Sequence, residues 1–198
     1  KDLKTVVCHL GNGASLCAVD GGKSVDTTMG LTPLEGLMMG TRSGDIDPAI
    51  IQFLAKKENM ELDEVLNVLN KKSGALGVYM ESSDFRVIED AIEEGDKQAR
   101  LTMDIFEYRV AKYIGSYAVA MGGLDVVAFA GGLGENYPLM RTNICNYLKV
   151  LGCEINVEEN QFRSKERVFS TDNSNIVAMV VPTNEELMIA RETFELVK

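Results

Sequence analysis

The sequence predicts a single α/β domain in which helices flank a mixed sheet. β-branched and apolar residues alternate between glycine turns over residues 4–30, which is typical of a strand meander. Later in the chain, helical segments alternate with two buried strands, at residues 125–130 and 176–181. A length of 198 residues with 45% hydrophobic residues is sufficient for one sizeable core.

The meander consists of three strands, expected at residues 5–10 (TVVCHL), 14–20 (ASLCAVD) and 23–29 (KSVDTTM). Gly21 and Gly22 form the second turn. The first turn lies within HLGNGAS, residues 9–15. Its glycines allow either a plain hairpin or a backbone cradle for an anion, because glycine lets another group approach the main chain closely.

Helices follow a long irregular connection at residues 31–45, a kind of segment that is often functional. We expect the first helix to begin at Pro48 with Asp47 as its cap. The others are expected at residues 62–74, 82–95, 96–121 and 138–152 and from Thr183 onward. GGLGENYP, residues 131–138, is expected to be the loop that joins a buried strand to a helix.

Charge and composition exclude several classes of partner. The net charge of -10, without a basic cluster, disfavours nucleic acid. The most apolar window, residues 113–132, is interrupted by a Gly-Gly pair and by Asp125, so we expect no membrane span. The four cysteines show no CxxC pairing, which disfavours a metal or disulfide framework and fits a reducing, cytoplasmic environment.

Two glycine-rich junctions and two charged ones are candidates for chemistry, because ligands gather at strand ends in open α/β sheets. HLGNG and GGLGEN each follow a strand, and neither matches a dinucleotide or Walker A pattern. Each junction also fits an ordinary turn. The chain has a single histidine, His9, so it offers no histidine-rich metal set, and we propose no Ser-His-Asp arrangement.

The charged junctions are TRSGDIDP (residues 41–48) and VPTNEEL (residues 181–187). Arg42 is either a phosphate ligand, for which its planar fork of donors is suited, or a surface partner of Asp45. Thr183 and Glu186 fit a helix capping box, which leaves Glu185 free. That carboxylate either favours the helix dipole or holds Mg²⁺ at a phosphate site.

In this order, HLGNGAS, TRSGDIDP, SSDFR, GGLGEN and PTNEEL resemble the carboxy-terminal half of the acetate kinases, acyl-phosphate-forming kinases of the actin, hexokinase and Hsp70 superfamily. The resemblance covers essentially the whole chain, and its specificity comes from the order of five motifs. It implies a ribonuclease-H-like mixed sheet flanked by helices, with ATP or ADP as substrate and Mg²⁺ as cofactor. Residues 1–198 would form a single nucleotide-binding domain.

The resemblance also assigns residues to roles. Arg42 stabilises the transferring phosphoryl group, and Glu185 belongs to the Mg²⁺ site. The phosphates contact a loop made of His9, Leu10, Gly11, Asn12 and Gly13. Two further segments surround the adenosine: Asp84, Phe85 and Arg86, and Gly132, Leu133, Gly134, Glu135 and Asn136.

Members of this family are about twice as long, and their amino-terminal half supplies further catalytic groups. The chain begins inside a strand and without methionine, so we expect an excised half that does not turn over acetate alone. Family members are homodimers, for which residues 110–121 are one candidate surface and packing under the sheet is the alternative. Two other functions stay open: a propionate kinase, and a nucleotide-binding module without transfer activity.

Overall fold

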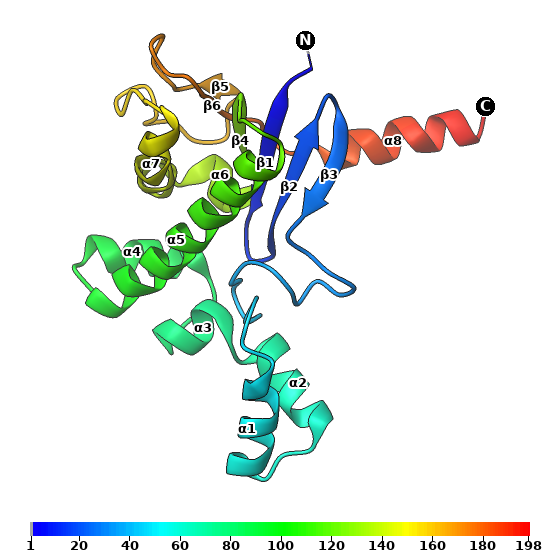
Figure 1. The fold of residues 1–198 in the computed structure, drawn as a ribbon, viewed down its shortest axis with the longest axis vertical. Helices are drawn as coiled ribbons and strands as arrows, with labels where there is room; N and C mark the ends of the chain where they lie inside the picture. Colours follow the sequence, from blue (N-terminus) through cyan, green and yellow to red (C-terminus); the bar gives the residue numbers. More distant parts are fainter. Residues whose placement is uncertain (1) are drawn as a thin grey trace.

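A six-stranded sheet forms the centre of the fold in the computed structural model, which describes residues 2–198 (Figure 1). The strand order is β3-β2-β1-β4-β6-β5. The strands span Lys4–Leu10 (β1), Ala14–Asp20 (β2), Lys23–Thr27 (β3), Val126–Ala130 (β4), Arg167–Val168 (β5) and Val177–Val180 (β6). β1, β2 and β3 form the predicted antiparallel meander, whereas β4 is parallel to both β1 and β6. The predicted mixed sheet is therefore confirmed.

The carboxyl ends of β1, β4 and β6 meet at one edge of the sheet, because the three strands are parallel. His9 of β1 is in register with Ala130 of β4, and Phe129 with Val180 of β6. The connections that follow these strands consequently leave from the same edge. This is the part of an α/β sheet where ligands bind.

The long helix α5 (Lys97–Ala120) covers one face of β1 and β2. On β1, Val6, Cys8 and Leu10 face this helix side and are fully buried, whereas the intervening residues stay partly exposed. Helices α3 (Gly74–Tyr79), α4 (Phe85–Glu93) and α7 (Pro138–Tyr147) pack in turn against α5. The core therefore lies between the sheet and this helical layer (Figure 1).

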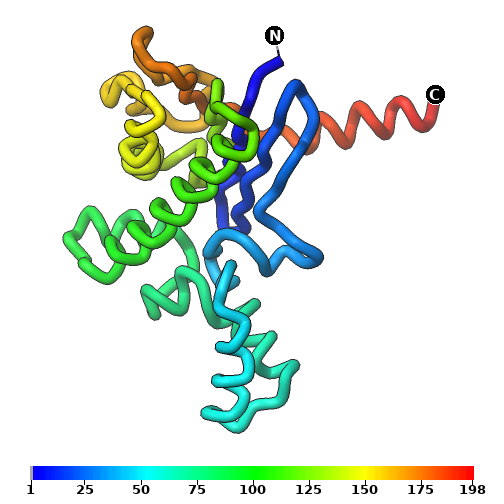
Figure 2. The backbone as a smooth tube through the Cα atoms, in the orientation of Figure 1, coloured from blue at the N-terminus to red at the C-terminus, as the bar shows by residue number. Residues whose placement is uncertain are grey.

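Three helices project from this body. Helices α1 (Ala49–Glu58) and α2 (Leu62–Lys71) pack against each other and extend away from the sheet (Figure 1). Helix α8 (Glu185–Leu196) extends in another direction and contains no buried residue (Figure 2). Among residues 2–198, no helix combines the length and the hydropathy that crossing a membrane requires.

Several local predictions are wrong. Residues 131–136 are the short helix α6 (Gly131–Asn136) and not a loop, because Gly131 adopts φ +75° and turns the chain sharply from strand to helix. Gly74 begins α3 and does not stop the preceding helix. Strand β5 and the 3₁₀ helix Leu148–Leu151 were not expected.

The predicted capping box of Thr183 and Glu186 does not form. The side chain of Asn184 caps α8 by accepting a hydrogen bond from the backbone nitrogen of Leu187. Thr183 instead contacts the start of α6, where its hydroxyl oxygen lies 3.3 Å from the backbone nitrogen of Gly131. A tertiary contact therefore replaces the local one.

Candidate functional site

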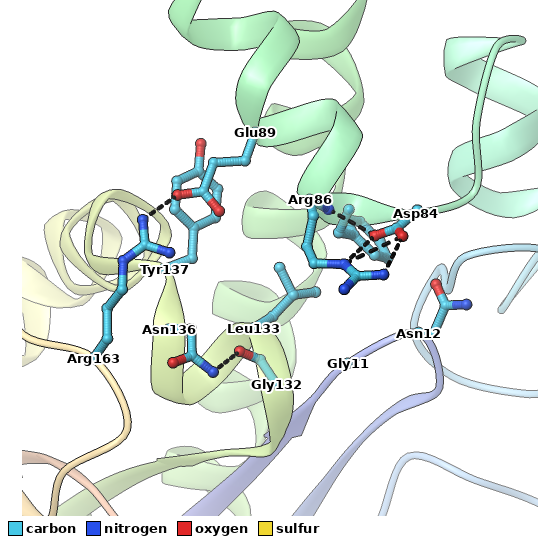
Figure 3. A pocket seen from close by; sticks show the side chains of 11 residues that line it. Gly11, Asn12, Asp84, Arg86, Glu89, Gly132, Leu133, Asn136, Tyr137 and Arg163 are labelled. Atoms are coloured by element: carbon cyan, nitrogen blue, oxygen red, sulfur yellow. Dashed lines mark hydrogen bonds and ion pairs between the residues drawn. The ribbon is translucent and has the colours of Figure 1, made fainter.

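A cavity of about 500 Å³ opens at the carboxyl edge of the sheet (Figure 3). Four segments distant in sequence form it: the turn after β1, the first half of α4, α6 with the residue that follows it, and the segment that carries Arg163. Its lining residues are Gly11, Asn12, Asp84, Phe85, Arg86, Glu89, Gly132, Leu133, Asn136, Tyr137 and Arg163. Eight of these eleven were predicted as site residues from the sequence.

The β1–β2 turn contributes main-chain surface at one end of the cavity. A Cβ on Gly11 would lie 3.4 Å from the carbonyl oxygen of Gly13 and 3.9 Å from the nitrogen of Gly132. Neither Gly11 nor Gly13 has a positive φ, and the two contacts of a Cβ on Gly11 are ordinary van der Waals distances, so neither backbone conformation nor packing within this chain requires glycine at position 11. Leu10 is fully buried beneath the turn, and His9 lies beside Gly131.

The start of α4 places a charged pair on the cavity wall. Asp84 caps the helix by accepting a 2.9 Å hydrogen bond from the backbone nitrogen of Arg86, and it also accepts from the Arg86 side chain at 2.6 Å. These hydrogen bonds hold the pKa of the Asp84 carboxyl below its usual value. Phe85, the residue between them in sequence, is buried, and the centroid of its ring lies 5.2 Å from that of Phe106.

Helix α6 presents one side to the cavity and the other to the sheet. Gly132 faces open space, and its carbonyl accepts a 2.9 Å hydrogen bond from the Asn136 side chain. Gly134 lies against the sheet, since a Cβ there would come within 3.3 Å of the carbonyl carbon of Phe129. Two predicted adenosine residues, Gly134 and Glu135, are thus absent from the lining of the cavity.

Glu135 has a different position in the structure. One of its carboxylate oxygens accepts from the backbone nitrogens of Gly131, at 3.1 Å, and Thr183, at 2.9 Å. These two hydrogen bonds join the start of α6 to the segment after β6. They fix the position of α6, and Glu135 does not line the cavity.

Three lining residues were not predicted from the sequence: Glu89, Tyr137 and Arg163. Arg163 comes from the irregular segment between the 3₁₀ helix Leu148–Leu151 and β5, and its guanidinium forms a 2.9 Å ion pair with Glu89 on α4. Burial raises the pKa of the Glu89 carboxyl, and it raises that of the Tyr137 hydroxyl to about 12. Only the tertiary fold brings Arg163 to this site, and no local motif marks it.

The segment that carries Arg163 is held by a buried cation. Arg141 on α7 is fully buried, and its guanidinium donates to the carbonyls of Gly134, Asn160 and Phe162, each at 2.9 Å. Its Nε also donates to the Asn160 side chain at 2.8 Å. Burial lowers the pKa of Arg141 to about 10. The guanidinium therefore joins α6 to the residues beside Arg163.

Arg42 lies beside the β1–β2 turn but is not among the residues that line the cavity. A Cβ on Gly13 would lie 3.9 Å from Nη1 of Arg42, whose guanidinium also contacts Sδ of Met39 at 3.5 Å. Within the described chain it forms no ion pair. Asp45, the alternative partner suggested by the sequence, instead accepts from Arg109 at 3.0 Å and from the Tyr113 hydroxyl.

The predicted metal ligand, Glu185, is exposed on the first turn of α8 and does not line the cavity. Residues 2–198 contain no group of three or more His, Cys, Asp or Glu side chains able to hold a metal ion. Mg²⁺ often takes one or two carboxylates and completes its coordination with substrate phosphates and water. The described residues therefore present no ready-made metal cluster, and the carboxylates that line the cavity, Asp84 and Glu89, are each paired with an arginine.

The arrangement fits an elongated anionic ligand. The backbone of Gly11 lies at one end of the cavity, with the unpaired Arg42 outside the lining and next to Gly13, and Leu133 and Phe85 provide apolar surface further along. Guanidinium and exposed main-chain N–H groups are donors that proteins use for phosphate. A flat group at the other end would contact apolar side chains.

Comparison with known proteins agrees with this geometry. The family model described as "Acetokinase family" matches residues 1–191. An acetate kinase of Lachnoclostridium phytofermentans is 59% identical over 194 residues, which are 98% of this chain and 49% of that protein. The crystal structure of Porphyromonas gingivalis acetate kinase superimposes with a TM-score of 0.95 at 45% identity, over 100% of this chain and 50% of that one.

A propionate kinase structure from Francisella tularensis is also similar. Its TM-score is 0.90 at 44% identity, and the match covers 97% of this chain and 49% of that one. The chain thus spans about half the length of the relatives that it matches.

Proposed function

The chain belongs to the acetokinase family, and from this premise we propose that it is the nucleotide-binding half of a two-domain acetate kinase. The enzyme would transfer the γ-phosphoryl group of ATP reversibly to acetate, giving acetyl phosphate and ADP. One observation carries the proposal. Predicted phosphate and adenosine residues, although distant in sequence, converge on one cavity, with the unpaired Arg42 beside its glycine turn.

The chemistry of phosphoryl transfer fits what this half provides. Charge on the transferring group must be neutralised and its oxygens held in line, while the protein does little covalent work. In the proposed site, residues 9–13 receive the β and γ phosphates, and Arg42 stabilises the transferring group. Asp84, Phe85 and Arg86, with Gly132, Leu133 and Asn136, hold the adenosine. Gly134 and Glu135 shape α6 from behind.

Mg²⁺ supplies charge neutralisation on the phosphates when it is bound. Glu185 is the residue that would hold it, together with phosphate oxygens and groups from the other half. The exposed position of Glu185 at the start of α8 leaves its carboxylate free for this. A helix N-terminus also favours anionic groups nearby.

The amino-terminal half would complete the site and provide most of the acetate pocket. Closure of two domains around a nucleotide excludes water from the reaction. We therefore propose that residues 1–198 alone do not turn over acetate. A cytoplasmic homodimer is the assembly expected from the family resemblance, and the exposed side chains of residues 110–121 are one surface for it.

A propionate kinase is the second candidate, favoured by the likeness to the Francisella tularensis structure. Acetate and propionate differ by one methylene, worth only about 1–3 kcal/mol in a binding pocket. A non-catalytic binding module is less consistent with the site, because nucleotide binding alone does not require an unpaired arginine beside the phosphate turn.

An assay of acetyl phosphate formation tests the proposal. The two-domain protein that carries residues 1–198 is incubated with ATP, Mg²⁺ and either acetate or propionate, and acyl phosphate is trapped as the hydroxamate. We expect activity with acetate, a lower kcat/KM with propionate, and none from residues 1–198 alone. No acyl phosphate from the two-domain protein with either acid would refute the kinase proposal.

A further inference from the structure

A second cavity adjoins the first behind α4. Its volume is about 550 Å³, and it is lined mainly by α4, α7 and the segment before β5. Glu89, Tyr137 and Arg163 line both cavities. These three residues therefore form the partition between them.

An ion pair between two separate elements lies across the partition, with the Arg163 side chain 60% exposed at its outer side. Nη2 of Arg163 lies 2.9 Å from Oε1 of Glu89, whose side chain is only 12% exposed. Tyr137 is 4% exposed, and its hydroxyl has no hydrogen-bond partner among the described residues. Figure 3 shows Glu89, Arg163 and Tyr137 together at one end of the first cavity, opposite Gly11 and Asn12.

This placement orients a nucleotide, if the proposed function holds. Phosphates at the β1–β2 turn lie beside Arg42, so the base extends toward the opposite end. That end is the Glu89–Arg163 pair. Beyond it, the second cavity presents apolar side chains, among them Ile92, Leu139, Val157 and Phe162.

We propose that the Glu89–Arg163 ion pair limits the size of the nucleotide base that the site accepts, by closing it off from the adjoining apolar cavity. Without the pair, the two cavities join, and an apolar substituent on the base has room behind it. The Glu89–Arg163 pair is thus a determinant of specificity that rests on the proposed nucleotide site.

The backbone around the partition is expected to stay in place when the Arg163 side chain is removed. Arg141 donates to the carbonyl of Phe162, the preceding residue, and holds Asn160 through two hydrogen bonds. The main chain of this segment is therefore anchored independently of the ion pair. An Arg163→Ala substitution therefore removes the side chain that forms the partition and leaves in place the backbone that carries it.

Binding of substituted nucleotides tests this inference. ADP and three derivatives, each with a benzyl-sized group at N6, C2 or C8, are titrated into the chain and into Arg163→Ala. We expect ADP to bind both proteins. For at least one derivative, the affinity relative to that of ADP should be tenfold or more higher in Arg163→Ala than in the unsubstituted chain. Glu89→Ala should give the same gain. Glu89→Gln should not, because glutamine keeps the size of the side chain and an oxygen that can accept the hydrogen bond from Arg163 and so hold the partition in place.

Lys165→Ala is the matched control, because Lys165 carries the same charge on the same segment and lines neither cavity. If the ratio of derivative affinity to ADP affinity were the same in all proteins, the inference would be overturned. Tight binding of every derivative to the unsubstituted chain would overturn it too. Absence of ADP binding to the unsubstituted chain would contradict the proposed function itself, and the inference would fall with it.

Discussion

The backbone nitrogen of Gly40 donates a 2.9 Å hydrogen bond to the carbonyl of Asn12. This bond joins the turn after β1 to the loop that carries Arg42, although β2 and β3 separate the two in sequence. The junction is tight, because a Cβ on Gly40 would lie against the side chain of Asn12 and 3.0 Å from the carbonyl oxygen of Ser83. The proposed phosphate turn and the proposed catalytic arginine are therefore held in one rigid arrangement.

A second contact leaves Arg42 available for an anion. Asp45, three residues away, accepts hydrogen bonds from Arg109 and Tyr113 of α5 and from the backbone nitrogen of Gly36. Its carboxylate is thus occupied elsewhere, which also fixes the end of the Arg42 loop against α5. Because no carboxylate pairs with Arg42 within the described chain, its positive charge is not offset by a neighbour and stays available to an anionic ligand.

Replacing Arg42 with alanine should separate binding from chemistry. In the two-domain protein we expect kcat to fall by about 10³-fold or more, because arginine stabilises charge that develops on the transferring phosphoryl group. The Kd for ATP should change by less than about tenfold. Steady-state kinetics and calorimetry measure the two quantities.

The matched control for Arg42→Ala is Arg191→Ala, which removes an exposed arginine of α8. It should leave kcat within about twofold of the unsubstituted value, as surface substitutions usually do. An equal loss of kcat and of affinity in Arg42→Ala would favour the binding-module alternative.

Much of the fold follows from local sequence patterns. The meander was predictable because alternation of apolar residues and glycine turns are local signals. Helix α5 was predictable because its cap at Asp96 and its long run of helical residues are read from neighbouring positions too. Helix α6 was missed because a strand-to-helix turn with glycine at positive φ looks like a loop in sequence. The prediction that Thr183 caps α8 was wrong, because a tertiary contact with Gly131 competes for the same hydroxyl.

The site residues were predictable from the sequence only where they belong to a local motif. Gly11, Asn12, Asp84, Phe85, Arg86, Gly132, Leu133 and Asn136 all line the cavity as expected. Glu89 and Arg163 lie 74 positions apart in sequence, and their pairing depends on the packing of α4 against the segment held by Arg141. No local pattern contains that information.

Replacing Arg141 with methionine should destabilise the chain strongly. Methionine retains much of the apolar volume but leaves the carbonyls of Gly134 and Phe162 and the side-chain oxygen of Asn160 without their donor. Each unsatisfied buried acceptor costs about 1–3 kcal/mol. We expect the free energy of unfolding to fall by about 3 kcal/mol or more in urea titrations. Arg191→Met, an exposed substitution, should change it by less than about 0.5 kcal/mol.

The pKa of Asp84 offers a test of the α4 cap. Hydrogen bonds from Arg86 lower this pKa in the folded state, so the cap contributes stability above the pKa of the unfolded chain and loses it as pH falls through the folded value. NMR titration should show a pKa below the ordinary value for aspartate. Arg86→Ala should raise it toward that value, and an unchanged pKa would contradict the contact.

Helix α8 should contribute little to the stability of this chain. None of its residues is buried, so deletion of residues 185–198 removes no core contact. We expect the free energy of unfolding to change by less than about 0.5 kcal/mol. A decrease of more than about 2 kcal/mol in urea titrations would show that α8 packs against the rest of the chain in solution.

Calorimetric titration of residues 1–198 with Mg·ADP tests the central claim most directly. We predict that the chain binds ADP and that Gly132→Val abolishes binding, because a side chain at Gly132 enters open space in the cavity. Gly115→Val, also directed into open space but on α5 away from the site, should bind like the unsubstituted chain. Absence of ADP binding by the folded chain, or equal binding by Gly132→Val, would contradict the assignment of the nucleotide site to this cavity.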